Sequence, residues 1–393
     1  MLSPSDETKW QSYRSDFPLL STCVYTNTGT LGPSPTPVTQ AFINSYLDWQ
    51  AKGPGRPAVY RQMHTDTDIV RAHLASFLHV TPGEIALTAN STDAINIVAN
   101  GLSWQPDDEV IISDQEHEAG LFIWLWLQQH GRLKVRIAKL GHDARSTLDN
   151  LAAKITPHTR LVAMSHVSCQ TGMRVPAKEI CELAHAAGAQ VLFDGAQATG
   201  QFPIDLRDMG VDYYAMNGHK WLLGPAGTGA LYIRSDRLPA LEPSWIGGWS
   251  ESEVRYAEDG YVHPLPDAHK FEYATRNFSL FWGFDRALSY LEDIGLDAVR
   301  ARELYLADIF INEVRRGGIE VISPAEEQSR TGLVSIKIPG VDPEQGVKTL
   351  WERYQVVARP VKELAAIRFS AAFFNTPEEM VQAARAALAL AEA

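Results

Sequence analysis

Two apolar segments that each end on polar residues constrain the fold of this 393-residue chain most strongly. The first, VLF, runs directly into the acid Asp194, and the second, VDYYAM, runs into Asn217, His219 and Lys220. A Gly-rich turn, GPAGTG, and a further apolar segment, ALYI, follow. Short apolar runs of this kind are typical of buried strands, and open α/β sheets bind ligands at the carboxyl ends of their strands. The sequence therefore places Asp194 and Lys220 at one ligand-binding edge.

The remainder of the chain alternates between strand-like and helix-like segments. This alternation predicts right-handed βαβ units, and so an α/β fold with a mainly parallel sheet and helices on both faces. Long helices and three further strands after residue 276 predict a smaller C-terminal α/β domain. We expect a large domain over residues 18–275 and a small domain made of residues 1–17 and 276–393. Residues 245–263 show no periodicity and are predicted to form a loop that could contact a partner subunit.

Composition excludes several classes of function. The net charge is −12 and no Lys- or Arg-rich run is present, which argues against nucleic acid or an anionic membrane as partner. No apolar stretch approaches the length of about 18 residues that spans a bilayer, and the segment MLSPSDETKW has no features of a secretory signal. The three cysteines match neither a disulfide framework nor a zinc site. The sequence predicts a cytoplasmic protein without a metal.

An acid and a lysine at one sheet edge suit a particular chemistry. Desolvation and neighbouring cations lower the pKa of a lysine, which turns it into an amine nucleophile. A nearby carboxylate can keep a ring nitrogen protonated, and the two groups together are what pyridoxal phosphate (PLP) catalysis requires. Taken singly, each residue has a simpler interpretation, because Asp194 could cap a helix and Lys220 could be a surface charge.

The motif DGAQ, followed by GHK and a Gly-rich turn, resembles the class V, fold-type I PLP enzymes. This superfamily includes cysteine desulfurases, cysteine/cystine C–S lyases, isopenicillin-epimerase-like proteins and kynureninases. The resemblance implies that PLP forms a Schiff base with Lys220 and that Asp194 contacts its ring nitrogen. It also implies that His117, in the pair Glu116-His117, stacks on the ring and can shuttle protons.

The resemblance assigns further residues to the cofactor. A helix N-terminus is an anion site, and Ser91 and Thr92 lie at the start of a predicted helix. Thr275 closes the segment FEYAT, which resembles a motif whose threonine reaches the phosphate of a neighbouring subunit, so a homodimer with a shared active site is implied. Either Gln170 or Cys169 could stand where relatives carry an asparagine that bonds the phenolic oxygen. The implied contacts to the phosphate and the phenolic oxygen are Ser91, Thr92, Asn217, His219, Thr275 and Gln197.

The C-terminal segment indicates the substrate. Arg368, in IRFS, matches a family arginine that grips the α-carboxylate, a role that suits its planar fork. Arg359 lies nine positions earlier and is implied to hold a second acidic or polar arm. Asn27 ends the first predicted strand, and the resemblance places the turn that follows it near the substrate. We therefore expect an amino acid as the small-molecule substrate.

Two features narrow the predicted reaction. Desulfurases carry a nucleophilic cysteine shortly before this arginine, whereas the corresponding segment here, ARPVKELAA, has none. The segments DYYAMNGHKW, GPAGTGALYI and FEYAT are most similar to those of the cysteine/cystine C–S lyases. The expected activity is β-elimination on cysteine, cystine or a cysteine S-conjugate. The alternatives are an aminotransferase, an epimerase or a kynureninase-like hydrolase on the same scaffold, and, in another class, a non-catalytic PLP-fold binding protein.

Overall fold

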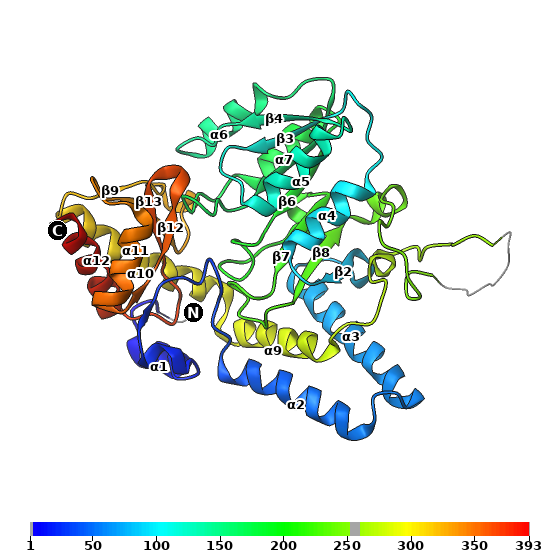
Figure 1. Ribbon diagram of the computed structural model, residues 1–393, viewed down its shortest axis with the longest axis horizontal. Coiled ribbons are helices and arrows are strands. Elements are labelled where there is room, and N and C mark those ends of the chain that lie inside the picture. The colour runs from blue at the N-terminus through cyan, green and yellow to red at the C-terminus, as the bar shows by residue number, and fades with distance from the viewer. Residues whose placement is uncertain (1–2, 252–259, 393) are drawn as a thin grey trace.

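The computed structural model describes residues 3–251 and 260–392, and a seven-stranded sheet lies at its centre (Figure 1). The strand order is β2-β8-β7-β6-β5-β3-β4. Within the sheet only β8 runs against its neighbours, because it is antiparallel to both β7 and β2 while the other pairs are parallel. The predicted mainly parallel sheet is thereby confirmed. Its strands are β2 (Ile85–Thr88), β3 (Glu109–Ser113), β4 (Lys134–Ala138), β5 (Thr159–Ser165), β6 (Gln190–Asp194), β7 (Tyr213–Asn217) and β8 (Gly229–Ile233).

Helices cover both faces of this sheet, as the alternation of elements predicts. On one face, Ile95, Val98 and Trp124 from α4 and α5 pack into a core with the strands. On the other face, a larger core includes Ile180 from α7 and Leu288 from α9 (Phe278–Ile294). The central strands are therefore buried on both sides and consist almost wholly of apolar residues. The helices that directly follow strands are α4 (Ser91–Gly101), α5 (Glu118–Gln129), α6 (Ala144–Ala152), α7 (Ala177–Ala186) and α8 (Leu206–Met209).

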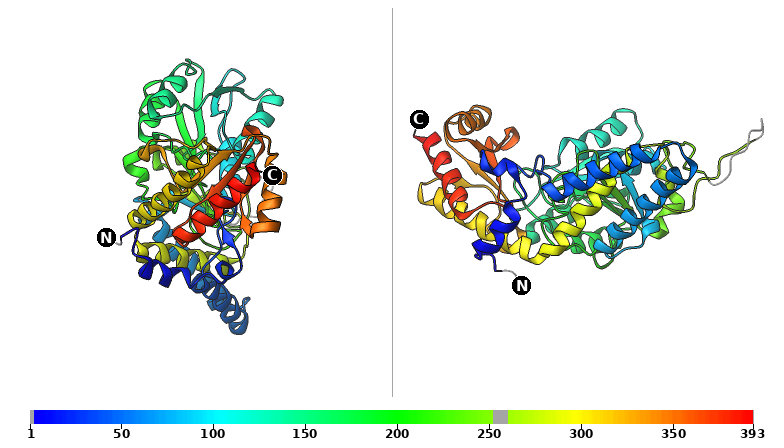
Figure 2. Two further views of the ribbon diagram at one scale, coloured as in Figure 1. Left: turned by 90° about the vertical axis from the view of Figure 1, so that its left-hand side faces the viewer. Right: turned by 90° about the horizontal axis from the view of Figure 1, so that it is seen from below.

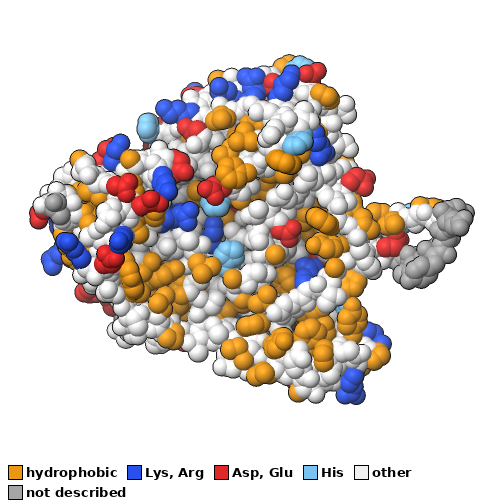
Figure 3. Space-filling view, in the orientation of Figure 1, with side chains coloured by type: hydrophobic (Ala, Val, Ile, Leu, Met, Phe, Trp, Pro, Cys, Tyr) orange, Lys and Arg blue, Asp and Glu red, His pale blue; other side chains and the backbone are white. Residues whose placement is uncertain are grey.

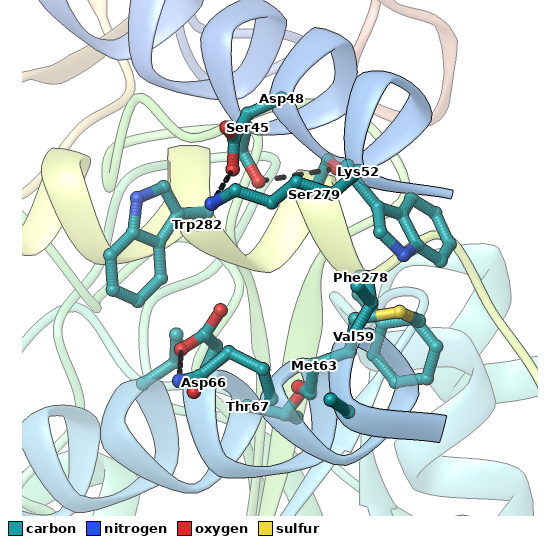
Figure 4. A pocket seen from close by; sticks show the side chains of 14 residues that line it. Ser45, Asp48, Lys52, Val59, Met63, Asp66, Thr67, Phe278, Ser279 and Trp282 are labelled. Atoms are coloured by element: carbon teal, nitrogen blue, oxygen red, sulfur yellow. Dashed lines mark hydrogen bonds and ion pairs between the residues drawn. The ribbon is translucent and has the colours of Figure 1, made fainter. Parts of the chain in front are cut away.

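Three long helices form an outer layer beside the sheet: α2 (Thr36–Lys52), α3 (Pro57–Phe77) and α9 (Phe278–Ile294). Both α2 and α3 pack against α9. The three enclose a cavity of about 230 Å³ beside the Lys52–Asp48 ion pair (Figure 4). None of the predicted site residues lines this cavity.

A second, antiparallel sheet of order β12-β13-β10-β9 lies at the other end of the molecule (Figure 2). It has its own apolar core with α10 and α12. Near the N-terminus, α1 (Glu7–Arg14) is followed by β1 (Val24–Tyr25), which pairs in parallel with β11. The expected smaller α/β unit is present, whereas its exact boundaries stay a prediction. Its elements are α10 (Leu296–Arg316), β9 (Glu320–Val321), β10 (Leu333–Lys337), α11 (Pro343–Tyr354), β11 (Val356–Val357), β12 (Arg359–Val361), β13 (Ala366–Ser370) and α12 (Pro377–Ala391).

Local predictions differ from the structure at a few points. The sequence alone places the cap and first turn of this helix at Ser91, Thr92 and Asp93, whereas the N-cap of α4 is Asn90, whose side chain accepts from the amide of Asp93 at 2.9 Å. Residues 252–259 of the predicted loop lie outside the described residues. Across the part of the chain that is described, no helix combines the length and the apolar character needed to cross a membrane.

Candidate active site

A cavity of about 330 Å³ opens where the central strands end. Its walls come from the carboxyl ends of β6 and β7, the start of α4 and α5, the turn after β1, and strands β12 and β13. The predicted residues that line it are Ser91, Thr92, His117, Asp194, Gln197, Asn217, His219, Lys220, Arg359 and Arg368. Segments that are far apart in the sequence thus supply one site.

Asp194 is the last residue of β6 and is buried. The amide of Ala196 donates to its carboxylate at 2.9 Å, which fixes the side chain against the turn that follows the strand. Burial raises the pKa of this carboxyl, while the nearby Lys220 opposes the rise. A buried carboxylate beside an amine is suited to hold a proton on a ligand atom.

Lys220 follows β7 and is only 8% exposed. Burial lowers the pKa of its amine, and no described residue is recorded as a hydrogen-bond or ion-pair partner of that amine. The turn after β1 packs directly onto it, since the Gly32 amide donates to the His219 carbonyl at 2.8 Å and a Cβ at Gly32 would lie 2.0 Å from the Lys220 carbonyl oxygen. The lysine is therefore held in a buried position that lowers the pKa of its amine and so increases the share of its uncharged form.

His117 is the N-cap of α5, and its Nδ1 accepts from the amide of Ala119 at 3.1 Å. A neutral ring that accepts at Nδ1 carries its proton on Nε2. Burial lowers the pKa of His117 to about 4, and the positive charges of Lys220, Arg359 and Arg368 add to the effect. The imidazole is consequently neutral at physiological pH.

The start of α4 forms the wall that suits an anion. Asn217 holds this end of the helix, because its side-chain oxygen accepts from the amide of Ser91 at 2.8 Å. The Nδ1 atom of His219 is buried without a protein partner. An orphaned polar atom beside a helix N-terminus indicates a site for a phosphate group.

Arg359 and Arg368 form the opposite wall. They face each other across the β12–β13 ladder, and each guanidinium donates to the hydroxyl of Thr30, at 3.2 and 3.1 Å. Arg368 also donates to the carbonyl of Cys169 at 2.6 Å. Burial lowers the pKa of Arg368 to about 10, so it remains charged at neutral pH. Among the described residues neither guanidinium has a carboxylate partner. The pair is therefore suited to bind a carboxylate of a substrate.

Some predicted residues do not line the cavity. Thr275 is exposed, and Asn27 lies in the turn beside the site with its side-chain oxygen buried and unpartnered. The side chains of Cys169 and Gln170 do not line it either. Gln197 does, but its amide also donates to the Gly29 carbonyl at 2.7 Å and accepts from the Trp221 indole.

Sequence reasoning missed four lining residues: Gly29, Thr30, Asn90 and Ala119. Of these Thr30 is the most informative, because it contacts both arginines. The only signal for it was its place in the Gly-containing turn TNTGTLG, which had already been placed near the substrate.

The residues present fit PLP. A buried acid and a buried amine share the cavity, a helix N-terminus with an orphaned histidine nitrogen can take a phosphate, and two unpaired guanidiniums can take a carboxylate. Comparison with known proteins agrees, because residues 25–383 match the family model of class-V aminotransferases. The chain belongs to the class-V aminotransferase family.

Several relatives of this class-V chain are similar over nearly their whole length. A probable cysteine desulfurase of Methanothermobacter thermautotrophicus is 32% identical, with 94% of this chain and 95% of the relative covered. The isopenicillin N epimerase of Streptomyces clavuligerus is 30% identical, with 97% of this chain and 98% of the relative covered. The similarity therefore extends to members that carry different activities in their names.

Two solved structures of C-DES, described as a cystine C–S lyase, are 28% identical to this chain. One is a complex with the reaction product cysteine persulfide and has a TM-score of 0.87, with 94% of this chain and 99% of the other covered. The second is a mutant with glycine covalently linked to the PLP cofactor and has a TM-score of 0.88, with 95% and 98% covered. The fold of this chain is thus that of a PLP-binding member of the family.

Proposed function

We propose that this protein is a PLP-dependent C–S lyase that performs β-elimination on cysteine, cystine or a cysteine S-conjugate. The observation that carries the proposal is one cavity that holds a buried amine, a buried carboxyl and two guanidiniums. The chain's three cysteines are all described, are free thiols, and do not line this cavity. A lyase needs no protein thiol at its active site, whereas a desulfurase of the persulfide-forming type does.

When bound, PLP supplies an electron sink that stabilises charge at the substrate Cα and allows a β-sulfur group to leave. Lys220 is placed to hold the cofactor covalently and to take the Cα proton with its amine, whose pKa burial lowers. Asp194 would hold the proton on the ring nitrogen of the bound cofactor. His117, neutral and with its proton on Nε2, would stack on the cofactor ring and could hand a proton to the leaving group.

The other lining residues bind and orient. We assign the phosphate to Ser91, Thr92, Asn217 and His219, and the phenolic oxygen to Gln197. We assign the α-carboxylate of the substrate to Arg368, and the second arm of a substrate such as cystine to Arg359. Asn27 supports this end from the adjacent turn.

We further propose a cytoplasmic homodimer with a shared active site. Thr275 is exposed on its own subunit, as expected for a residue that serves the phosphate of a partner. Hydrophobic side chains gather over α2, α3 and α9 on the face shown in Figure 3. The exposed large apolar side chains of α2 and α3 include Ile43, Leu47 and Ile69. Exposed apolar surface of this kind is typical of subunit contacts. We also propose a division into domains at 18–275 and at 1–17 with 276–393, which the separate apolar core of the antiparallel sheet with α10 and α12 supports.

The test is product analysis with the PLP-loaded protein. We expect pyruvate and ammonia from cystine or S-substituted cysteines without any keto acid, and a visible absorbance band that borohydride removes and that the Lys220→Ala variant lacks. Turnover that depends on a keto acid would indicate an aminotransferase. Inversion at Cα without pyruvate would indicate an epimerase, the activity named for the Streptomyces relative. Pyruvate formation from none of several S-substituted cysteines would end the lyase proposal.

A further inference from the structure

The hydroxyl of Thr30 is shared by the two arginines of the site. It accepts from Arg359 Nη1 at 3.2 Å and from Arg368 Nη2 at 3.1 Å. A hydroxyl oxygen has two lone pairs and one hydrogen to donate. Both lone pairs are engaged here, and among the described residues no acceptor is recorded for the hydrogen. Since Thr30 lines the cavity, that hydrogen is available to a ligand.

We propose that Thr30 is a specificity-determining residue, whose hydroxyl donates its hydrogen to the carboxylate of the substrate while its oxygen holds the two guanidiniums side by side. This inference rests on the proposed function, in which the substrate is an amino acid. It adds a neutral donor beside Arg368, to which the α-carboxylate is assigned, and the shared hydroxyl oxygen keeps Arg359 next to that site for the second arm of the substrate.

The local charge favours an anion at this point. Arg368 is 2% exposed, and its Nε atom is buried without a hydrogen-bond partner. Arg359 lies beside it in the β12–β13 ladder, and within the described chain neither has an ion-pair partner. A buried cation such as Arg368 is costly without a counter-charge, so a bound carboxylate would stabilise this wall. The free hydroxyl hydrogen of Thr30 also suits a carboxylate, because a carboxylate only accepts hydrogen bonds.

The turn that carries Thr30 is fixed from both halves of the molecule. The Thr30 amide donates to the Asn27 carbonyl at 2.9 Å, and the Gly29 amide donates to the Ser370 hydroxyl at 3.2 Å. On the other side Gln197 donates to the Gly29 carbonyl at 2.7 Å. A donor held in this way loses little freedom on binding, which increases its contribution to affinity.

Thr28 provides a matched control in the same turn. Its side chain is fully buried and its hydroxyl has no partner, but it does not line the cavity. Replacing Thr28 by Val therefore removes an equivalent hydroxyl without touching the proposed contact. Thr30→Val removes the donor at nearly constant shape, and Thr30→Ser retains it.

The test measures binding to the PLP-loaded protein of glycine, which has a carboxylate and no leaving group, and of glycinamide, which lacks the carboxylate. We expect Thr30→Val to raise the Kd for glycine about tenfold or more, as for a lost hydrogen bond to a charged group, and to change that for glycinamide less than about threefold. Thr30→Ser and Thr28→Val should bind glycine like the parent. With a β-elimination substrate, Thr30→Val should raise KM much more than it lowers kcat.

The structure of the glycine complex provides a second measurement that does not depend on variants. It should place a carboxylate oxygen within about 3 Å of Thr30 Oγ1. A separation too long for a hydrogen bond, or a Thr30→Val variant that binds glycine as tightly as the parent, would overturn the proposal. If the parent shows no β-elimination while glycine binding depends on the hydroxyl as expected, the lyase assignment fails and the role of Thr30 stands.

Discussion

Glu116 and Asp194 line one small cavity of about 10 Å³, which is room for about one water molecule. Glu116 is buried, and its carboxyl accepts from the amide and hydroxyl of Ser165, at 3.1 and 2.7 Å, and from the hydroxyl of Ser113. Ser165 in turn lies opposite Asp194 in the β5–β6 ladder. Burial raises the pKa of Glu116 to about 7, and the charge of Asp194 adds to the rise.

This burial predicts how stability depends on pH. Between pH 4.5 and about 7 the folded chain keeps a proton on Glu116 that the unfolded chain has lost. Because the folded state then binds more protons, the free energy of unfolding falls as pH rises through this window, by as much as about 3 kcal/mol. Glu116→Gln has no such proton to lose. When urea unfolding is measured at a series of pH values, the free energy of unfolding of the variant should rise relative to that of the parent up to about pH 7. Above that pH the difference should stay constant.

The matched control for Glu116 is Asp149→Asn, which removes an exposed carboxylate on α6 that is paired with Arg145. It should leave the shape of the pH curve unchanged over the same window, since a solvated carboxylate contributes little. Parallel curves for the Glu116→Gln variant and the parent would mean that Glu116 is ionised in the folded protein at pH 5.

The second prediction concerns His117, whose pKa is lowered to about 4. NMR of histidine-labelled, cofactor-free protein should show an imidazole that titrates near pH 4, identified by its loss in His117→Gln. Here the unfolded chain takes up the proton first, so this group's contribution to stability is lost as pH falls from about 6.5 towards 4. Lys220→Met removes a neighbouring positive charge and should move the midpoint upward. A midpoint near 6.5 in the parent would contradict the described environment.

Much of the fold and the site follows from strand ends that the sequence displays. Asp194 and Lys220 close apolar runs, and parallel strands in an α/β sheet bring such ends to one edge. The motif resemblance identified both arginines. The strand that carries Arg359 was not predicted, because β12 has only three residues and one of them is Pro360.

What the sequence could not provide are contacts between distant segments. Thr30 is hydrogen-bonded to Arg359 and Arg368, which lie 329 and 338 positions away in the sequence. The local sequence pattern of a turn does not indicate such contacts. The cap of α4 was misplaced for a different reason: Asn90, Ser91 and Thr92 are consecutive residues that all cap helices well, so only geometry distinguishes them.

The third prediction tests an ion network that attaches the FEYAT segment to the central sheet. The buried carboxylate of Glu272 accepts from Arg71 at 2.8 Å, from Arg276, and from the amide of Leu87 in β2 at 2.7 Å. Glu272→Gln removes the carboxylate that Arg276 and the buried Arg71 share, which leaves Arg71 only its ion pair with the exposed Asp68, and should lower the free energy of unfolding by about 3–5 kcal/mol. The exposed pair of Lys52 and Asp48 is the control, because Asp48→Asn should cost less than about 1 kcal/mol. Equal losses in the two variants by urea unfolding would show that the network does not stabilise the fold.

The last prediction concerns Gly195, which directly follows Asp194. A Cβ at this position would lie 2.1 Å from the ring of Tyr214, whose side chain is fully buried and bonded to His166 at 2.9 Å. Because that ring cannot move away freely, Gly195→Ala should destabilise the protein by about 1–3 kcal/mol and displace the neighbouring carboxylate, which weakens PLP binding.

Urea unfolding and a PLP absorbance titration measure the two effects of Gly195→Ala separately. Gly55→Ala is the control, since a Cβ there meets nothing within 4 Å and should leave both quantities unchanged. If the cause is steric, replacing Tyr214 by the smaller Leu in the Gly195→Ala background should recover part of the cofactor affinity even where the lost ring lowers stability. Unchanged PLP affinity in Gly195→Ala would show that the position of Asp194 does not depend on this contact.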